Sequence, residues 1–299
     1  MQKSVFFFMA FVMACLDSRG EDWPQYLGPT RDAVSTETGL LRAWPEDGPE
    51  VLWTVPLGEG FGGPAVSGGM VYLLDLKESE SDVLRCFRLE DGEPVWSFEY
   101  DAPGETSFRG SRSVPAVDDG HVYTCGPFGD VYCFDRNTHR PVWNKNVWKA
   151  FGGGDRVPTW AVSQNPLVYD NLLILASQTK QAGLVAYKKR TGDVAWTSPA
   201  LPGRVGYVSP SIIPIGGRDH VVMISAGPRP EAPESSQPGA VLGLDPQNGE
   251  TLWSYGGWQC KIPVPNVTAI GDGRLFITGG YKAGSAMIQV EKQGEDFVA

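Results

Sequence analysis

The stretch Cys86-Phe-Arg-Leu-Glu-Asp-Gly-Glu-Pro-Val-Trp96 decides the fold, because its pattern returns in register along the chain. Three more copies of the same length run from Cys133 to Trp143, from Ala186 to Trp196 and from Gly243 to Trp253. A small residue opens every copy and a tryptophan closes it. The seventh position is Gly92, Gly192 or Gly249 in three copies and His139 in the fourth.

This spacing has a physical explanation. A glycine or another turn residue reverses the chain between two strands. The tryptophan then folds back over the turn and covers a position where only a small side chain leaves room. Burial of an indole side chain stabilises the folded state by several kcal/mol, on the order of the value expected from its apolar area. We therefore expect Trp96, Trp143, Trp196 and Trp253 to be structural residues that dock each sheet on its neighbour.

Each copy is the last part of a longer repeat. The four repeats open with Pro64-Ala-Val, Pro115-Ala-Val, Pro166-Leu-Val and Pro210-Ser-Ile, and each continues with an alternating apolar run. The 37 glycines and 24 prolines of the chain disfavour helices. Four short strands per repeat make one sheet, and sheets repeated around an axis make a β-propeller. The predicted fold is all-β, with four-stranded blades.

The pattern from small residue to tryptophan resembles the tryptophan-docking motif of the PQQ-like, quinoprotein-type propeller superfamily. The segment Asp22-Trp-Pro-Gln-Tyr-Leu-Gly-Pro29 also resembles the start of exported PQQ-like repeat proteins. The resemblance covers about residues 22–299 and includes the propeller lipoproteins of outer-membrane β-barrel assembly.

A fifth repeat begins at Pro265-Asn-Val, and its eleventh position falls on Val298, so its tryptophan is missing. Conversely, Val51-Leu-Trp-Thr-Val55 resembles a last strand without the preceding three. We expect blades at about 57–98, 108–145, 158–198, 205–255 and 260–299, within a propeller region of 51–299. Either the strand at 51–55 closes a five-bladed ring, or the chain is an incomplete seven- or eight-bladed propeller. The second interpretation is favoured.

The N-terminus is typical of an exported protein. Lys3 precedes an apolar run from Val5 to Ala14, and small residues allow cleavage after Gly20. Residues 1–20 are therefore predicted to be a signal peptide, and 21–50 an N-terminal extended segment. A lipid anchor on Cys15 is the less favoured alternative. No second apolar run reaches the length of a transmembrane helix, so the expected location is the periplasm or the cell surface.

Composition and scattered motifs exclude several functions. The chain has 35 acidic and 25 basic residues and a net charge of −10, which disfavours a nucleic-acid partner. The three histidines do not converge, so no metal site is predicted. The cysteines outside the signal peptide are expected to be small buried residues, and the segment Lys77–Asp82 is expected to be a solvated acidic loop.

The connectors between blades supply the candidate binding residues. Each connector precedes an opening proline, and all connectors reach one face of a propeller around its central channel. Three residues before the proline lie Phe61, Arg112, Ser163, Tyr207 and Ile262. The predicted funnel residues are Arg109, Arg112, Arg156, Trp160, Arg204, Tyr207, Gln259 and Lys261. Cations and aromatic rings together suit an anionic or carbohydrate-like ligand or a peptide. Alternatively, these side chains pack the blade interfaces and neutralise carboxylates.

Three classes of function remain open. The favoured one is a non-catalytic scaffold that binds a protein or peptide partner; a carbohydrate-associated protein is another. The resemblance also implies a PQQ-dependent dehydrogenase or a degenerate relative, which would hold PQQ with calcium through carboxylate and amide ligands. Many such enzymes carry two adjacent cysteines, which this chain lacks. No catalytic residue is therefore assigned and no cofactor is expected, with PQQ and calcium as the alternative.

Overall fold

The computed structural model describes residues 20–78, 80–229 and 237–299. The predicted signal peptide, apart from Gly20, and the alternative anchor at Cys15 lie outside the described residues. Residues 21–50 contain turns and one isolated β-bridge, between Trp23 and Val66. Among the described residues there is no helix long and apolar enough to cross a membrane.

Five blades follow one another along the described part of the chain: blades 1 to 4 are four-stranded antiparallel sheets, and blade 5 is a three-stranded sheet followed by a two-stranded hairpin. Blade 1 holds β1 (Ala65–Ser67), β2 (Met70–Lys77), β3 (Ser81–Arg88) and β4 (Pro94–Asp101). Blade 2 holds β5 (Ala116–Val117), β6 (His121–Cys125), β7 (Asp130–Asp135) and β8 (Arg140–Asn146). The 3₁₀ turn η1 (Lys149–Phe151) follows it.

Blade 3 holds β9 (Leu167–Tyr169), β10 (Leu172–Ala176), β11 (Leu184–Lys188) and β12 (Val194–Thr197). Blade 4 holds β13 (Ser211–Ile215), β14 (Arg218–Ile224), β15 (Val241–Leu244) and β16 (Thr251–Tyr255). Blade 5 holds β17 (Thr268–Gly271), β18 (Arg274–Gly279) and β19 (Gly284–Gln289), followed by the hairpin of β20 (Glu291–Gln293) and β21 (Asp296–Val298). The predicted all-β fold with four-stranded sheets is confirmed.

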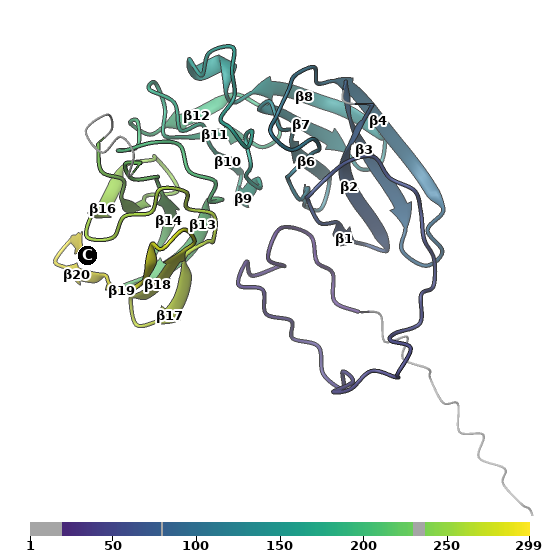
Figure 1. Cartoon of the computed structure of the whole chain (residues 1–299), viewed down its shortest axis with the longest axis horizontal. Helices are drawn as coiled ribbons and strands as arrows, with labels where there is room; N and C mark the ends of the chain where they lie inside the picture. The colour runs from purple at the N-terminus through teal and green to yellow at the C-terminus, as the bar shows by residue number, and fades with distance from the viewer. Residues whose placement is uncertain (1–19, 79, 230–236) are drawn as a thin grey trace, which may run out of the picture.

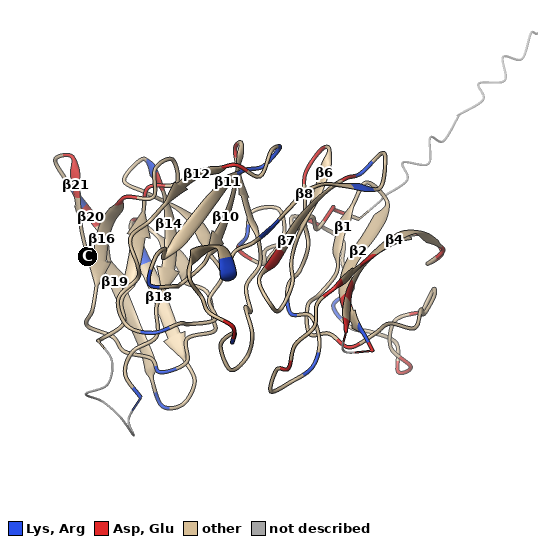
Figure 2. Cartoon of the chain, turned by 90° about the horizontal axis from the view of Figure 1, so that it is seen from above, with Lys and Arg blue, Asp and Glu red and all other residues tan. Residues whose placement is uncertain are grey.

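The blades stand side by side in an arc, and the N-terminal segment lies on its concave side (Figure 1). Four buried clusters fill the spaces between neighbouring blades, so the core is a series of layers between sheets. Figure 2 shows that the charged residues are concentrated in the turns at both ends of the strands, while the strands are mostly uncharged. This distribution follows from the burial of the sheet faces, since a charge between two sheets would lose its hydration.

Each of the first three tryptophans of the repeat packs on the turn of the next blade, whereas Trp253 donates its Nε1 hydrogen to Nδ1 of His220 in its own blade at 2.9 Å. Trp143 of blade 2 lies against Gly192 of blade 3, where a Cβ atom would come within 2.7 Å of the indole. Its Nε1 donates a hydrogen bond to the carbonyl of Lys189 at 3.0 Å. Trp196 makes the same bond to the carbonyl of Pro246. The small position lies within the same blade as its tryptophan, because Ala186 pairs directly with Trp196.

The turn glycines adopt a left-handed backbone, with φ of 71° at Gly192 and 76° at Gly249. His139, the exception in the sequence pattern, adopts the same conformation with a φ of 60°. Its ring stacks on Trp96 at 5.2 Å with an interplanar angle of 11°. The imidazole therefore meets the incoming indole face to face, where the other blades leave room by having no side chain.

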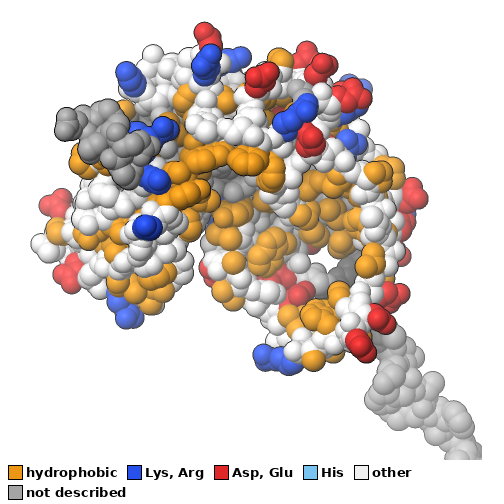
Figure 3. All heavy atoms as spheres, in the orientation of Figure 1, with side chains coloured by type: hydrophobic (Ala, Val, Ile, Leu, Met, Phe, Trp, Pro, Cys, Tyr) orange, Lys and Arg blue, Asp and Glu red, His pale blue; other side chains and the backbone are white. Residues whose placement is uncertain are grey.

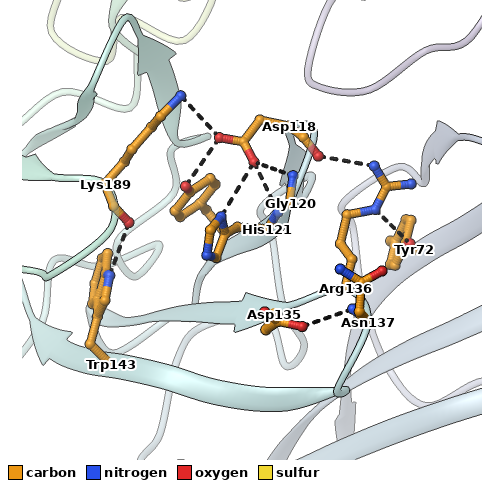
Figure 4. A network of polar contacts seen from close by, with 10 residues as sticks. Tyr72, Asp118, Gly120, His121, Asp135, Arg136, Asn137, Trp143 and Lys189 are labelled. Carbon is orange, nitrogen blue, oxygen red and sulfur yellow. Dashed lines mark hydrogen bonds and ion pairs between the residues drawn. The ribbon is translucent and has the colours of Figure 1, made fainter.

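Polar side chains reinforce the same joints on the side of the strand turns (Figure 4). Asp118 of blade 2 forms an ion pair with Lys189 of blade 3, with 3.1 Å between Oδ2 of the carboxylate and Nζ of the lysine. Arg136 of blade 2 donates to the hydroxyl of Tyr72 and to the carbonyl of Ser67, both in blade 1. Lys189 and Arg136 occupy equivalent positions of the repeat, and each sends its side chain back toward the preceding blade.

The structure corrects two predictions at the ends of the repeat. Val51–Val55 forms no strand in the part of the chain that the structure describes, although Trp53 packs on Gly92 and donates to the carbonyl of Leu89. In blade 5, Gln289 pairs with Arg274 as Arg88 pairs with Met70 in blade 1. That register puts Phe297, not Val298, at the tryptophan position, and Phe297 is buried.

Two further predictions meet different outcomes. Cys86, Cys125, Cys133 and Cys260 are buried and free, as expected of small residues. The segment at Lys77–Asp82 is not a solvated loop throughout. β2 extends to Lys77, β3 begins at Ser81, and Asp82 is fully buried. β2 and β3 extend into this segment because Lys77 pairs with Ser81, which is the last pair of the ladder between the two strands.

The joint between blades predicts the effect of adding one methyl group at Gly192. Gly192→Ala forces a side chain into a left-handed backbone and against the indole of Trp143. Gly217→Ala is the matched control, since Gly217 has a φ of 81° and nothing within 4 Å of its would-be Cβ. We expect Gly217→Ala to cost about 1 kcal/mol and Gly192→Ala about 1–3 kcal/mol more. Urea unfolding measures the free energy of unfolding of each variant. Equal midpoints for Gly192→Ala and Gly217→Ala would show that the contact with Trp143 adds nothing to the cost of the substitution.

Candidate functional site

Blade connectors meet around a hollow of about 250 Å³. Its lining residues come from the segment before blade 1 and from the four connectors between blades 1 and 5, and they are Phe61, Phe108, Arg112, Trp160, Ser163, Tyr207 and Val264. We call this the aromatic hollow. Four of them are the residues that stand three positions before an opening proline, so the connector rule brings Phe61, Arg112, Ser163 and Tyr207 together. Ile262, the fifth such residue, is not among them.

The walls of the aromatic hollow are held by contacts between blades. The rings of Trp160 and Tyr207 meet edge to face at 5.2 Å. The guanidinium of Arg112 lies over the ring of Phe61, 5.4 Å from its centre. Arg112 also donates to the carbonyls of Phe108 and Gly110, which fixes its orientation. Partial burial lowers the pKa of Arg112, but a guanidinium keeps its charge at neutral pH.

Two predicted funnel residues tie the backbone together instead of lining the hollow. Arg204 donates to the carbonyls of Gly227 and Lys261. Gln259 pairs with both backbone groups of Gly239. These contacts join the connector after blade 4 to the loop between β14 and β15. For both residues the structure favours the alternative interpretation, in which connector side chains pack the interfaces between blades.

The remaining predicted cations lie apart from one another. Lys261 places its ammonium over the ring of Tyr281 at 5.3 Å. Arg109 pairs with Glu59 at 3.5 Å, as expected of a cation that neutralises a carboxylate. Arg156 lines a different, larger hollow of about 610 Å³ together with Lys149. The eight predicted residues therefore do not form one site, and Arg112, Trp160 and Tyr207 are the three that share the aromatic hollow.

The N-terminal segment brings a residue that the connector rule could not find. Arg31 donates hydrogen bonds to the carbonyls of Pro166 and Pro210, the residues that precede the inner strands β9 and β13. Burial lowers the pKa of Arg31 to about 9. Upstream, Trp23 exchanges two backbone hydrogen bonds with Val66 in β1. One irregular segment thus contacts three blades through these residues, and the repeat pattern gives no signal for it.

A buried carboxylate anchors the connector that carries Phe108 and Arg112. Asp82 accepts hydrogen bonds from the hydroxyls of Ser111 and Tyr100. The carbonyl of Ser111 in turn accepts from the amides of Phe61 and Gly62. Burial raises the pKa of Asp82 to about 6, and the neighbouring carboxylates of Asp130 and Asp75 act in the same direction. The acidic segment of the sequence thus contains a structural residue that anchors this connector.

The residues present do not fit a PQQ–calcium centre. Within 20–78, 80–229 and 237–299, no three His, Cys, Asp or Glu side chains cluster so that they could hold a metal ion. Calcium prefers six to eight oxygen ligands with several carboxylates. The four free cysteines lie at separate positions of the core, and the aromatic hollow contributes one cation and no carboxylate.

The contacts of Arg31 predict what happens when its guanidinium is removed. Arg31→Ala leaves two carbonyls without their donor and releases the N-terminal segment from β9 and β13. We expect faster hydrogen exchange at the amide of Val66, which bonds to Trp23. Arg42→Ala is the control, because Arg42 is exposed in the same segment. Unchanged exchange at Val66 in Arg31→Ala, measured by mass spectrometry, would contradict this role.

The environment of Asp82 predicts a pH effect with a definite sign. The folded state holds this proton up to about pH 6, whereas an unfolded Asp releases it near pH 4. The contribution of Asp82 to stability is therefore greatest below pH 4 and is lost as the pH rises through 6. Asp82→Asn cannot ionise and so does not show this loss. The free energy of unfolding of the variant, relative to that of the wild type at the same pH, should therefore rise by up to about 3 kcal/mol between pH 4 and pH 6.5. Urea unfolding at several pH values measures the change; Asp101→Asn, an exposed carboxylate on β4, is the control.

Comparisons with known proteins place the chain in a family. Residues 26–114 and 79–259 match the family described as outer membrane protein assembly factor BamB. The quinoprotein alcohol dehydrogenase PedH of Pseudomonas putida KT2440 is 28% identical over 176 residues, which are 58% of this chain and 27% of that protein. The assembly factor BamB of Shewanella oneidensis MR-1 is 26% identical over 165 residues, 55% of this chain and 40% of that protein.

Among solved structures, BamB from Moraxella catarrhalis matches with a TM-score of 0.48 and 19% identity, covering 82% of this chain and 68% of that one. The chain spans less than half the length of the two relatives from Pseudomonas and Shewanella. The family match covers more than half of the chain and includes the four copies of the tryptophan pattern. The chain belongs to the PQQ-like repeat family of the outer membrane protein assembly factor BamB.

Proposed function

We propose that this chain is an exported, non-catalytic propeller that binds a segment of a partner protein in the aromatic hollow. The family match and the relative from Shewanella, named as an assembly factor, support a scaffold role. The N-terminal sequence supports export to the periplasm or the cell surface. The observation that carries the proposal is the aromatic hollow itself, with its exposed rings and rigid walls.

The size of the hollow favours a side chain over a free small molecule. Pockets for small ligands usually measure about 300–1,000 Å³ and enclose most of the ligand. The aromatic hollow measures about 250 Å³, which suits one large side chain. Phe61, Phe108 and Val264 at its rim are 63%, 59% and 52% exposed. Aromatic anchors and an arginine around a small pocket are typical of the central residues of protein interfaces.

The surface around the hollow extends the apolar contact. Figure 3 shows hydrophobic side chains gathered around the middle of the arc. Exposed apolar side chains that lie together mark a binding surface more often than ones that are scattered singly. Because the lining comes from the segment before blade 1 and from four connectors between blades, a bound side chain would contact segments that belong to several blades.

A PQQ-dependent dehydrogenase is the second candidate, because relatives such as PedH are quinoprotein enzymes. The family fold is compatible with it, while the described residues offer no calcium ligand set. The two candidates differ in what they bind, so one experiment on residues 21–299 can separate them.

Selection from a displayed library of random peptides, followed by calorimetric titration, tests the proposal. We expect the folded protein to enrich peptides with one large apolar residue and to bind them at micromolar Kd. Trp160→Ala should weaken binding at least tenfold, because it removes one wall of the hollow. Trp44→Ala is the matched control, since Trp44 is 63% exposed outside the hollow.

Two outcomes would contradict the scaffold proposal. One is a folded protein that enriches no peptide, or that binds equally well after Trp160→Ala. The other is saturable binding of PQQ with calcium, accompanied by dye-linked alcohol oxidation. That second result would favour the dehydrogenase.

A further inference from the structure

The segment 51–55 makes one half of a joint between blades. Trp53 lies against Gly92 of blade 1, where a Cβ atom would come within 2.7 Å of the indole. Its Nε1 donates a hydrogen bond to the carbonyl of Leu89 at 2.9 Å. Trp143 makes the same two contacts with the turn of blade 3. Trp53 therefore takes the position of a fourth-strand tryptophan in a blade that would precede blade 1.

The other half of this joint is not made at Trp53. A tryptophan of the repeat also pairs with the third strand of its own sheet, as Trp143 does with Cys133. Within 20–78, 80–229 and 237–299, residues 51–55 pair with no strand and make no backbone hydrogen bond. The side chains of Val51 and Leu52 are each 75% exposed. The segment thus offers the backbone and apolar side chains of a fourth strand without the third strand that it would join.

Blade 5 shows the complementary arrangement. β19 pairs with β18 along one edge, and no strand of the described chain pairs with its other edge. In blades 1 to 4 the third strand always pairs with a fourth. After β19 the chain turns away, since β21 packs against β16 and the ring of Phe297 meets that of His220 edge to face at 4.4 Å. The outer edge of β19 therefore presents backbone groups that can pair with an added strand.

The face of blade 5 beside this edge is apolar and uncovered. Met287 pairs with Phe276 as Cys86 pairs with Tyr72 in blade 1. Cys86 and Tyr72 are 1% and 2% exposed and contact Trp96, whereas Met287 is 53% exposed and Phe276 is partly exposed. Met287 is larger than the small residue of the other blades, but an unbranched thioether can turn aside and contact an aromatic ring favourably. This face lacks one strand that carries a tryptophan.

We infer that residues 51–55 of one molecule add to the outer edge of β19 in a second copy of this chain, as its fourth strand. A strand added to a free sheet edge gains backbone hydrogen bonds, and its side chains select the register. Trp53 then covers Phe276 and Met287 of the second copy while it keeps its contact with Gly92. The indole holds blade 5 of one copy against blade 1 of the other, as Trp143 holds blade 2 against blade 3. None of these residues lines the aromatic hollow.

The contacts within the arc favour a second copy over closure of one chain on itself. Blades 1 and 5 stand at opposite ends of the arc (Figure 1). The N-terminal segment bridges its concave side, because Trp23 pairs with β1 and Arg31 donates to the carbonyls before β9 and β13. Closure would change these contacts and the angles between blades, whereas a second copy leaves them intact. The two surfaces differ, so the association is head-to-tail and continues until a ring closes.

Sedimentation velocity of residues 21–299 between about 1 and 100 µM tests this inference, a range that covers a micromolar Kd. We expect the mass to rise with concentration in whole multiples of one chain. Hydrogen exchange at the same concentrations, followed by mass spectrometry, should slow at least fivefold within 51–55 and 284–289 as the mass rises. The reason is that these amides gain hydrogen-bond partners only in the assembly.

Variants on each side of the contact identify the surfaces. Val51→Pro with Leu52→Pro removes backbone donors that point to either side of the added strand, and Met287→Glu places a charge beneath Trp53. Each change should weaken association at least tenfold. The matched controls are Leu40→Pro with Leu41→Pro, which are 61% and 64% exposed in the N-terminal segment, and Val194→Glu, which is 49% exposed on β12. The controls should associate like the wild type.

Three results would overturn the inference. The first is the mass of a single chain at every concentration; protection of 51–55 and 284–289 in that monomer would show that the contact forms within one chain. The second is association that neither the proline pair at 51–52 nor Met287→Glu weakens, which would place the contact on another surface. The third is an equal loss of association in Val194→Glu, which would show that exposed apolar residues associate without specificity.

Discussion

The packing of an indole from one blade on a left-handed turn of the next is the contact on which the rest of the structure depends. Trp143 needs Gly192, and the carbonyl of Lys189 completes the joint with a hydrogen bond. The four buried clusters lie between blades. Each blade is therefore stabilised mainly by its neighbours, as in other repeat architectures. The connectors have defined positions only because these joints fix the angle between successive sheets.

The N-terminal segment supplies a second set of contacts that does not follow the repeat. Trp23 extends the sheet of blade 1 by one pair of backbone hydrogen bonds, and Arg31 reaches the carbonyls before β9 and β13. A guanidinium suits this role because it presents several donors in a fixed plane and can serve carbonyls of two blades at once. The inner strands are short, so their ends carry backbone groups that the sheets alone leave unpaired.

Sequence reasoning succeeded where a position has one structural environment in every repeat. The indole-to-turn spacing and the third position before the opening proline are of this kind, and the latter found Phe61, Arg112, Ser163 and Tyr207. It failed where the path of a loop decides the direction of a side chain, as at Arg204 and Gln259, whose partners are backbone groups. A shift of one residue in the last hairpin likewise moved the tryptophan position from Val298 to Phe297. Hydrophobicity patterns could not reveal that Asp82 is buried, because its partners lie on another strand and in a connector.

The way the aromatic hollow is built links binding to the stability of the propeller. Phe108, Trp160 and Tyr207 come from connectors that join different pairs of blades, and Phe61 comes from the segment before blade 1. A side chain placed between them contacts all of these joints, so any opening between the blades would break the bound state. A ligand that binds only the assembled form stabilises it by an amount set by its concentration and affinity. Occupation of the hollow therefore acts in the same direction as the indole contacts on the opposite side of the blades, since both hold neighbouring sheets at one fixed angle.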